Sequence, residues 1–187
     1  MRGIFFKAAS AAICILSVHM VAGQEKTERL DSAVVSLSRA GDKTPVAFTT
    51  VDRRTLRGAN PINSLPEALA LQPSVVTYNE GGTGLGNSAI TIRGSKGSQI
   101  NVTLNGITLN DQESQEVFWV NIPSLSNIIS SVQVQRGLGT TANGAGAFGA
   151  SINMSTEAAG IDPTGRVDLS YGSWNTWSAT VSGGSGL

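Results

Sequence analysis

The side chains best suited to nucleophilic, acid–base or zinc chemistry are scarce in this sequence. Its single cysteine and single histidine, Cys14 and His19, both lie within the first 23 residues. That stretch has a basic head, an apolar core over residues 8–21 and small residues at 21–23, which together predict an export signal cleaved before Gln24. The apolar core is shorter than the roughly 20 residues that a transmembrane helix needs. We therefore expect a mature chain with no catalytic residue, no metal site and no cofactor.

Two other motifs could suggest chemistry, but neither has the context that the chemistry needs. Gly144-x-Gly146-x-x-Gly149 matches a dinucleotide-binding fingerprint, yet the residues after it alternate like a strand where a helix is required. Asp111, Glu113 and Glu116 fit no metal-ligand spacing, and we interpret them as part of a solvated loop. Without Arg2 and Lys7, 11 of the 13 basic residues remain against 13 acidic ones. This negative balance is unfavourable for nucleic-acid binding.

The elements that carry these residues are short and mixed. A Ser64-x-x-Glu67 capping box predicts a helix through Leu71, and Asn105-Gly106 predicts a tight hairpin. A glycine-rich loop at 79–88 is expected to be mobile. We predict an α+β domain of short strands and short helices, because period-two segments alternate with helical turns. The predicted strands are 46–50, 75–78, 89–93, 100–104, 107–109, 131–136 and 150–155, and the helical turns are 52–57 and 123–127.

The tail of the sequence has a different pattern. Residues 166–171 and 176–181 each alternate apolar with polar side chains, around a Gly172-Ser173 turn. Such a hairpin, with aromatic residues near its ends, is typical of a transmembrane β-barrel wall whose apolar side faces lipid. The edge of a soluble hairpin is the alternative.

Five motifs in the domain, taken in order and at their spacing, resemble the plug domain of TonB-dependent outer-membrane receptors. The resemblance covers about Leu30 to Thr156, although Leu138 and Thr140 depart from the usual residues of one turn. It implies an α+β plug domain of short strands and short helices, followed by the first β-hairpin of a truncated transmembrane β-barrel. Plugged barrels close with about 22 strands, so we expect this chain to be an N-terminal fragment. The motifs are Ile92-Arg93-Gly94, Val102 to Ile107, Ile122 to Leu125, Val132 to Gly137 and Gly144 to Asn153.

A short β-prone segment interrupts the polar residues that follow the predicted signal. From its residues alone it could be the first strand of the domain, or an extended segment within a flexible arm that pairs as an added strand with another protein's sheet. The resemblance implies the second, a TonB box. The implied TonB-binding residues are Asp31, Ser32, Ala33, Val34, Val35 and Ser36. The expected division is a signal peptide at 1–23, a flexible arm at 24–43, a plug domain at 44–157 and the start of a barrel at 158–187.

Two arginines and two loops are the remaining candidates for function. Arg93 and Arg136 each end a predicted strand before a glycine, and either pair with acidic groups on the barrel wall or lie at the surface as ordinary strand-end arginines. Loops 79–88 and 110–119 are candidates for ligand contact, through neutral amides and aromatic rings; the aromatics could instead pack against the barrel interior. The ligand-contact candidates are Asn110, Gln112, Gln115, Phe118 and Trp119.

The resemblance implies a transport component rather than an enzyme. The expected function is energised import of a scarce solute, most often a ferric chelate, haem or cobalamin, in the outer membrane of a Gram-negative bacterium. The expected partners are TonB with its inner-membrane energising complex, outer-membrane lipid and a small metal-chelate or cobalamin-like ligand, with no nucleic acid. A glycan-importing receptor of the same family and a periplasmic ligand-binding module without a barrel are the alternatives. The short stretch before the predicted box makes the glycan importer the less favoured of the receptors.

Overall fold

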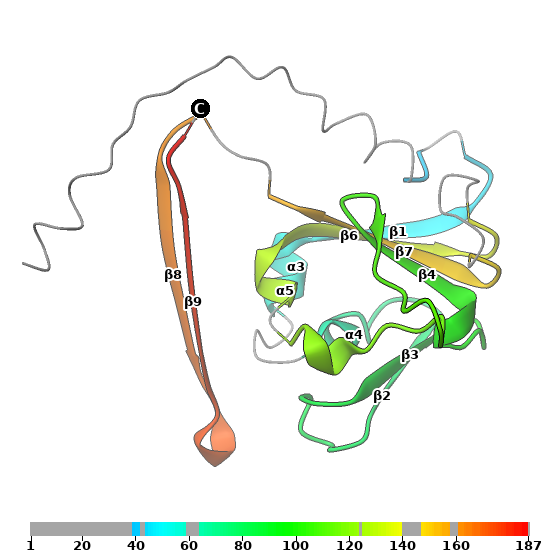
Figure 1. Cartoon of the computed structure of the whole chain (residues 1–187), viewed down its shortest axis with the longest axis horizontal. Coiled ribbons are helices and arrows are strands. Elements are labelled where there is room, and N and C mark those ends of the chain that lie inside the picture. Colours follow the sequence, from blue (N-terminus) through cyan, green and yellow to red (C-terminus); the bar gives the residue numbers. More distant parts are fainter. Residues whose placement is uncertain are drawn as a thin grey trace, which may run out of the picture.

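The computed structural model describes residues 39–41, 44–58, 64–123, 125–139, 147–157 and 161–186. A five-stranded sheet lies at the centre of this part of the chain, in the order β1-β6-β7-β4-β5 (Figure 1). β4 and β7 are parallel, whereas the other neighbouring strands in the sheet are antiparallel. Its strands are β1 (Ala47–Asp52), β4 (Ile100–Leu104), β5 (Ile107–Thr108), β6 (Ile129–Arg136) and β7 (Ala150–Thr156).

The hairpin predicted at Asn105-Gly106 is confirmed. Asn105 has a φ of 51° and Gly106 a φ of 83°, as the two central residues of a type I′ turn require. The turn joins β4 to β5, with Leu104 opposite Ile107. The Asn105 amide also donates to the Thr156 hydroxyl at 2.9 Å, which ties the turn to the end of β7.

Short helices cover one face of the sheet (Figure 1). Asp52 begins the first of them, because its carboxylate accepts the Thr55 backbone N–H at 2.9 Å. Its hydrogen bonds with Thr55 lower the pKa of Asp52. Within the part of the chain that the structure describes, no helix has the length and apolar character needed to cross a membrane. The helices are α3 (Arg53–Gly58), α4 (Leu65–Ala68) and α5 (Leu125–Ile128), with 3-10 turns η1 (Gly97–Gln99) and η2 (Trp119–Asn121); a further 3-10 turn, η4 (Ser173–Asn175), lies in the tail.

The predicted capping box at Ser64 is wrong. The Ser64 hydroxyl makes no hydrogen bond and is buried, while the Ser64 backbone N–H donates to the Gly84 carbonyl at 2.9 Å. α4 is a single turn that ends at Ala68, short of the predicted Leu71. Packing against β2 and β3, rather than a cap, therefore holds this turn in place.

Apolar side chains from alternate positions of the strands meet the helices in one core. Burial of such side chains, at about 25 cal/mol per Å² of apolar surface, is the main stabilising term for a small domain. Trp119 belongs to this core, although it follows a polar loop. The core consists of Val51, Leu56, Leu65, Ala68, Leu69, Val75, Ile90, Ile92, Ile100, Val102, Trp119, Leu125, Ile129, Val132, Val134, Ala150, Ile152 and Met154.

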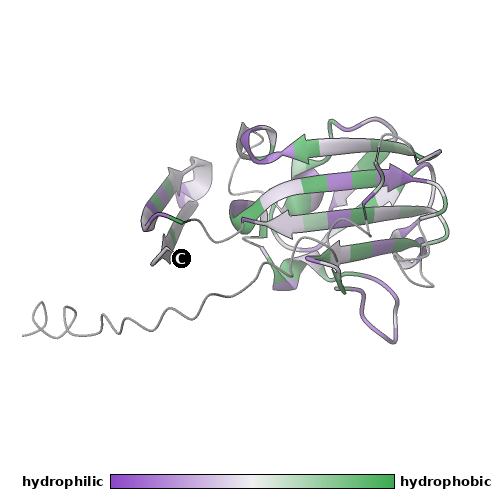
Figure 2. Cartoon of the chain, turned by 90° about the horizontal axis from the view of Figure 1, so that it is seen from above, coloured by the Kyte–Doolittle hydropathy of each residue, from purple (hydrophilic) through white to green (hydrophobic). Residues whose placement is uncertain are grey.

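The opposite face of the sheet is polar, and it is buried as well. Strand pairing places Thr50, Gln133, Asn153 and Thr103 side by side across β1, β6, β7 and β4, and we call this row the polar ladder. Its three inner members are at most 4% exposed. The Thr103 hydroxyl donates to the Asn153 amide oxygen at 2.8 Å. Polar and apolar residues accordingly alternate along the strands (Figure 2).

Two separate hairpins complete the described fold. β2 (Val75–Asn79) pairs with β3 (Ser88–Ile92), and β8 (Thr164–Tyr171) pairs with β9 (Trp177–Gly184). The β8–β9 hairpin lies beside the α3 and α5 side of the domain, and the loop between β2 and β3 lies toward the same end as its turn (Figure 1). All seven strands predicted between residues 46 and 155 are present, as are both strands of the tail.

The two faces of the β8–β9 hairpin differ in polarity, as predicted. The apolar pairs Val167–Val181, Leu169–Ala179 and Tyr171–Trp177 share one face, and every member is exposed. The polar side chains between them are half-buried, and the Thr180 hydroxyl accepts a hydrogen bond from the Asn127 amide of α5 at 3.2 Å. The polar face therefore turns toward the domain and the apolar face away from it.

Gly149 is a position where the fold excludes a side chain. Its N–H donates to the Gln99 carbonyl and its carbonyl accepts from the Gly137 N–H, both at 2.9 Å, so its backbone is fixed between the start of β4 and the end of β6. A Cβ at Gly149 would overlap the Ser95 side chain.

We expect Gly149→Ala to lower the free energy of unfolding by about 1–3 kcal/mol, the usual cost of overpacking. Urea unfolding followed by far-UV circular dichroism measures this loss. Gly58→Ala is the matched control, because a Cβ there meets nothing within 4 Å. Adding Ser95→Gly to Gly149→Ala should restore most of the stability, and equal stability of both alanine variants would contradict the packing argument.

Candidate functional site

Arg136 ends β6 as a buried cation rather than as a surface side chain. It is 8% exposed, its Nε donates to the Pro73 carbonyl at 2.9 Å, and its Nη2 bonds to the Thr49 hydroxyl. Burial, and then the charge of Arg93, lower the pKa of Arg136 below the ordinary arginine value. The guanidinium group of an arginine keeps its charge in proteins at neutral pH. Arg136 thus joins the loop after α4 to the edge strand β1.

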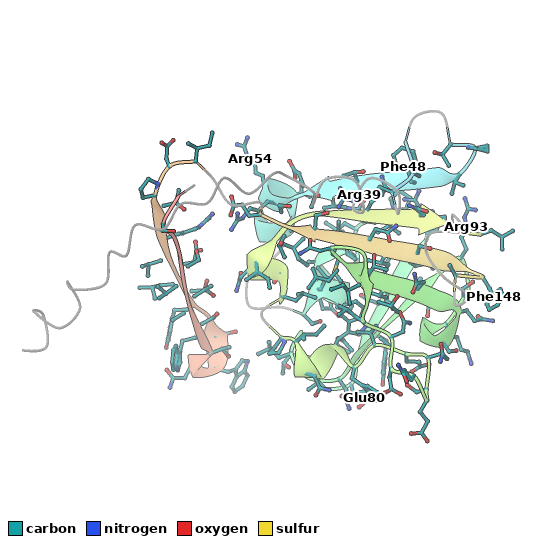
Figure 3. All side chains as sticks on the ribbon, turned by 45° about the horizontal axis from the view of Figure 1, so that its top comes forward. Arg39, Phe48, Arg54, Glu80, Arg93 and Phe148 are labelled. Carbon is teal, nitrogen blue, oxygen red and sulfur yellow. The ribbon has the colours of Figure 1, made fainter. Side chains whose placement is uncertain are left out.

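Arg93 lies next to Arg136 at the same end of the sheet. Its Nη1 donates to the Arg136 carbonyl at 3.3 Å, and its backbone N–H donates to the Ser74 carbonyl at 3.0 Å. Arg93 is exposed, and its backbone, with a φ of 52°, is in the left-handed region just before Gly94. Figure 3 shows Arg93 and Phe148 together at this end.

Two positive charges therefore lie close together at this end of the sheet, that of Arg136 inside the domain and that of Arg93 in solvent. The ion pairs among the described residues are Arg53–Glu157 and Arg166–Asp168, and neither involves this cluster. Arg136 is held by uncharged oxygens inside the domain, so the simple surface-arginine interpretation does not describe it. Arg93 is the member that faces solvent, and pairing with a barrel-wall carboxylate stays a prediction.

The loop of residues 110–118 is anchored by its first amide. Asn110 accepts the Val102 N–H through Oδ1 and donates through Nδ2 to the Ile100 and Gln115 carbonyls, all at 2.8 Å. Gln115 donates its side-chain amide to the Gln112 carbonyl at 2.8 Å. Both N–H groups of Asn110 are thus engaged in holding the loop against β4. Ligand contact by Asn110, Gln112 and Gln115 stays a prediction.

The two aromatic candidates separate in the structure. Trp119 is 5% exposed and packs in the core of the domain, whereas Phe118 is 52% exposed. Trp119 forms part of the wall of a cleft of about 260 Å³, together with β3, η1 and the chain before η2. Lys96 and Glu116 also line this cleft. Phe118 alone of the pair offers an exposed ring.

The first acidic residue of the same loop, Asp111, holds the loop backbone. One carboxylate oxygen of Asp111 accepts the backbone N–H groups of Glu113 and Ser114 and the Ser114 hydroxyl, at 2.8–3.1 Å. Hydrogen bonds from Ser114, backbone first, lower the pKa of Asp111. Among the described residues, no group of three or more acidic, histidine or cysteine side chains is arranged to hold a metal ion.

The loop between β2 and β3 is closed by its own polar groups. The Glu80 N–H donates to the Asn87 carbonyl at 3.0 Å, and the Asn87 amide donates to the Glu80 carboxylate at 3.2 Å. The Asn79 amide reaches the Leu85 carbonyl at 3.0 Å. Glu80 lies on the far side of the domain from Arg39 (Figure 3). The expected mobility of this loop stays a prediction.

Residues that the sequence did not single out form a junction between the domain and the β8–β9 hairpin. Arg53 of α3 pairs with Glu157, just after β7, and donates through Nη2 to the Asn127 carbonyl at 3.3 Å. Asn127 in turn donates to Thr180 of β9. No sequence signal identified this junction, because its members are single polar residues on α3, on α5, on β9 and in the segment after β7.

A second missed contact joins the start of the described chain to the sheet. Ala40 exchanges two hydrogen bonds with the Gln133 side chain, and Arg39 donates to carbonyls of β6 and β7. Burial lowers the pKa of Arg39. The alternation of Val132-Gln133-Val134-Gln135 could have flagged this face, because polar residues in a strand buried on both sides need partners. The predicted signal peptide and the TonB-box residues 31–36 lie outside the described residues.

The described part of the chain combines two features: a mixed sheet with a buried polar face, and a following hairpin whose apolar face points away from that sheet. Comparison with known proteins identifies the class to which this arrangement belongs. The family model described as TonB-dependent Receptor Plug Domain matches residues 40–151. The match covers more than half of the chain, and the chain belongs to this family. No curated protein matches the chain.

Solved structures share the fold. The copper transporter OprC superposes with a TM-score of 0.60 at 18% identity, over 73% of this chain and 21% of that one. The ferric yersiniabactin uptake receptor FyuA from Yersinia pestis gives 0.52 at 20% identity, over 72% and 20%. The siderophore receptor PirA from Acinetobacter baumannii gives 0.53 at 20% identity, over 65% and 19%. The chain therefore spans about a fifth of the length of these structures.

The contacts of Arg136 generate a stability prediction. Arg136→Lys keeps the charge but replaces a fork of donors by one ammonium, which cannot keep both the Pro73 carbonyl and the Thr49 hydroxyl in the present geometry. We expect a loss of about 1–3 kcal/mol in the free energy of unfolding. Arg54→Lys, at an exposed position of α3, is the control and should change little. Equal stability of the two variants in urea titrations would refute the structural role of Arg136.

Proposed function

We propose that this chain is the plug domain and the beginning of the barrel wall of an outer-membrane receptor that imports a scarce solute with energy supplied through TonB. The observation that supports this most directly is the β8–β9 hairpin. It follows the plug immediately, turns its polar face toward it through Asn127 and Thr180, and exposes three apolar pairs on the other face. A soluble binding module has no use for such a face, whereas a lipid-facing wall requires it.

The division of the chain follows from this proposal. Residues 1–23 form the signal peptide, 24–43 the arm that carries the TonB box, 44–157 the plug and 158–187 the start of the barrel. The described strands are compatible with these limits, because β1 begins at Ala47, β7 ends at Thr156 and β8 begins at Thr164.

The proposed cargo is a ferric chelate, haem or cobalamin. Receptors for ferric yersiniabactin and for siderophores share the fold, which supports a metal-chelate cargo as a class. The copper transporter with the same fold widens that class beyond iron. Phe118 and the amides of loop 110–118 are the proposed contacts on the plug, together with the loop between β2 and β3.

The proposed mechanism is gated import. The plug fills the barrel lumen, and a solute that binds its outer loops shifts the population of the arm toward a released state. TonB then pairs with residues 31–36 as an added strand, since β-branched residues such as Val34 and Val35 favour an extended form. Arg93, exposed beside the buried Arg136, is the proposed site of a charge pair with the barrel wall that retains the plug.

A proline in the proposed box tests the coupling to TonB. Val34→Pro in the complete receptor removes a backbone donor from the strand that TonB would extend. We expect energised uptake to fall to background while binding of the cargo to cells is unchanged. Radiolabelled ferric chelates offered to iron-starved cells supply the measurement, and Thr27→Pro, outside the box, is the control. Normal uptake by the Val34 variant would sink the proposal.

The hairpin offers a separate test of membrane insertion. Leu169→Arg places a charge on the exposed apolar face, which costs about 2–4 kcal/mol near the middle of a bilayer. We expect a marked drop in the folded receptor recovered from outer membranes, measured by heat-modifiable migration on gels. Ser170→Arg, on the polar face one residue later, should be better tolerated. The reverse order of the two variants would contradict the assignment of the lipid-facing side.

A further inference from the structure

The first described residues of the chain are fastened to the middle of the plug sheet. The Ala40 N–H donates to Oε1 of Gln133 at 2.7 Å, and Nε2 of Gln133 donates to the Ala40 carbonyl at 3.0 Å. These two bonds reproduce one rung of a β-ladder, made by a side chain instead of a neighbouring strand. The partners are 93 residues apart in sequence, and both are buried.

The Gln133 amide is itself held in position by the polar face. Gln135 donates its amide to Oε1 of Gln133 at 2.9 Å, and Thr50 lies 3.4 Å from Nε2. With Ala40 in place, Gln133 is 4% exposed. Loss of Ala40 would remove one hydrogen bond from each group of this amide, and would leave Oε1 with Gln135 and Nε2 with only the long bond to Thr50.

Arg39 adds a weaker and more costly attachment. Its Nη2 donates to the Ser131 carbonyl at 3.1 Å and to the Asn153 carbonyl at 3.2 Å, on the adjacent strands β6 and β7. Its Nε is buried without a hydrogen-bond partner. Two carbonyls hold the Arg39 cation, but its Nε–H has no partner and would be hydrated if Arg39 left the sheet. The contact of Arg39 with the sheet is therefore readily reversed.

We propose that Arg39, Ala40 and Gln133 form a latch that holds the arm on the plug sheet, and that the opening of this latch sets how often the arm is released. We call these residues the arm latch. The proposal rests on the proposed import function, because the TonB box ends only three positions before Arg39. Its specific content is that one side chain of β6 governs release of a segment far away in sequence.

The test measures arm release without TonB and without cargo. The complete receptor carries Ser38→Cys, and the rate of reaction with a fluorescent maleimide reports exposure of that position. The unsubstituted receptor, from which Cys14 is removed with the signal peptide, gives the background. Gln133→Met keeps the volume of the side chain and removes both hydrogen bonds to Ala40. We expect the labelling rate to rise about tenfold or more, as for the loss of two neutral hydrogen bonds.

A second variant opens the latch from the arm side. Ala40→Pro removes the donor to Gln133 and leaves the polar ladder unchanged, so it should also raise the labelling rate several-fold. Thr50→Val is the control, because it alters the other neighbour of Gln133 and spares Ala40. Heat-modifiable migration verifies that each barrel is folded. If Gln133→Met does not fold, Ala40→Pro decides the question.

The outcomes separate the latch from the function on which it rests. Faster labelling in both latch variants, with Thr50→Val unchanged, supports the latch. Unchanged labelling in folded latch variants overturns it, as does a rise in Gln133→Met alone or an equal rise in Thr50→Val. The import function fails independently if the Val34→Pro receptor takes up its cargo normally, whatever the labelling rates show.

Discussion

The described structure depends on one constraint: its central sheet is buried on both faces, and only one of them is apolar. An apolar face can be covered by any side chains of suitable shape, but a polar face must be satisfied group by group. Thr103 bonds to Asn153 and Gln133 bonds to Thr50 across neighbouring strands, while Val132 and Val134 on the other face of β6 build the core. The polar face also selects the segment that covers it. The Ala40 backbone bonds to the Gln133 amide, and the Arg39 guanidinium bonds to strand carbonyls. A second apolar face would bind its cover more strongly and with less selectivity.

The same preference for separate polar contacts recurs where the plug meets the hairpin. Asn127 and Thr180 form one hydrogen bond, and Arg53 links α3 to Glu157 at the exit of the chain from the sheet. Neutral hydrogen bonds are each worth about 0.5–1.5 kcal/mol net, so a few of them position two bodies without fusing them. The buried Arg136 is the counterpart inside the plug: its partners are all uncharged oxygens of the domain, and it fixes the end of β6. Rigid contacts within the plug and separable contacts around it fit a body that must be held and yet be able to move.

Much of this fold could be predicted because local signals agree with it. Period-two alternation predicted the strands, Asn105-Gly106 predicted the hairpin, and the ordered motifs from Ile92-Arg93-Gly94 to the glycine-rich turn predicted the plug family, which the match to residues 40–151 confirms. The failures concern tertiary context. The Ser64 cap is absent because packing of α4 decides that turn, and Trp119 lies in the core although its sequence neighbours are polar. The contacts of Gln133 with Ala40 and of Arg53 with Glu157 join residues about a hundred positions apart, and no local pattern encodes such pairs. The substrate-contacting residues and the TonB box stay predictions for the same reason: their partners are other molecules.

The place of β1 in the sheet has a mechanical consequence. Among the described strands, β1 is an edge strand that pairs with β6 alone, from Ala47 opposite Arg136 to Asp52 opposite Ser131. Ala40 bonds to the Gln133 side chain, whereas β1 begins opposite Arg136, at the end of β6. Along β1 the chain then comes back to Gln133, which lies opposite Thr50. Tension on the chain before β1, once it leaves Gln133, would reach the sheet at Ala47, the rung nearest Arg136. An antiparallel edge strand that is pulled from its end and away from its neighbour loses its rungs one after another, here starting at Ala47. The sheet can thus be unzipped from one edge while β6, β7 and β4 remain paired.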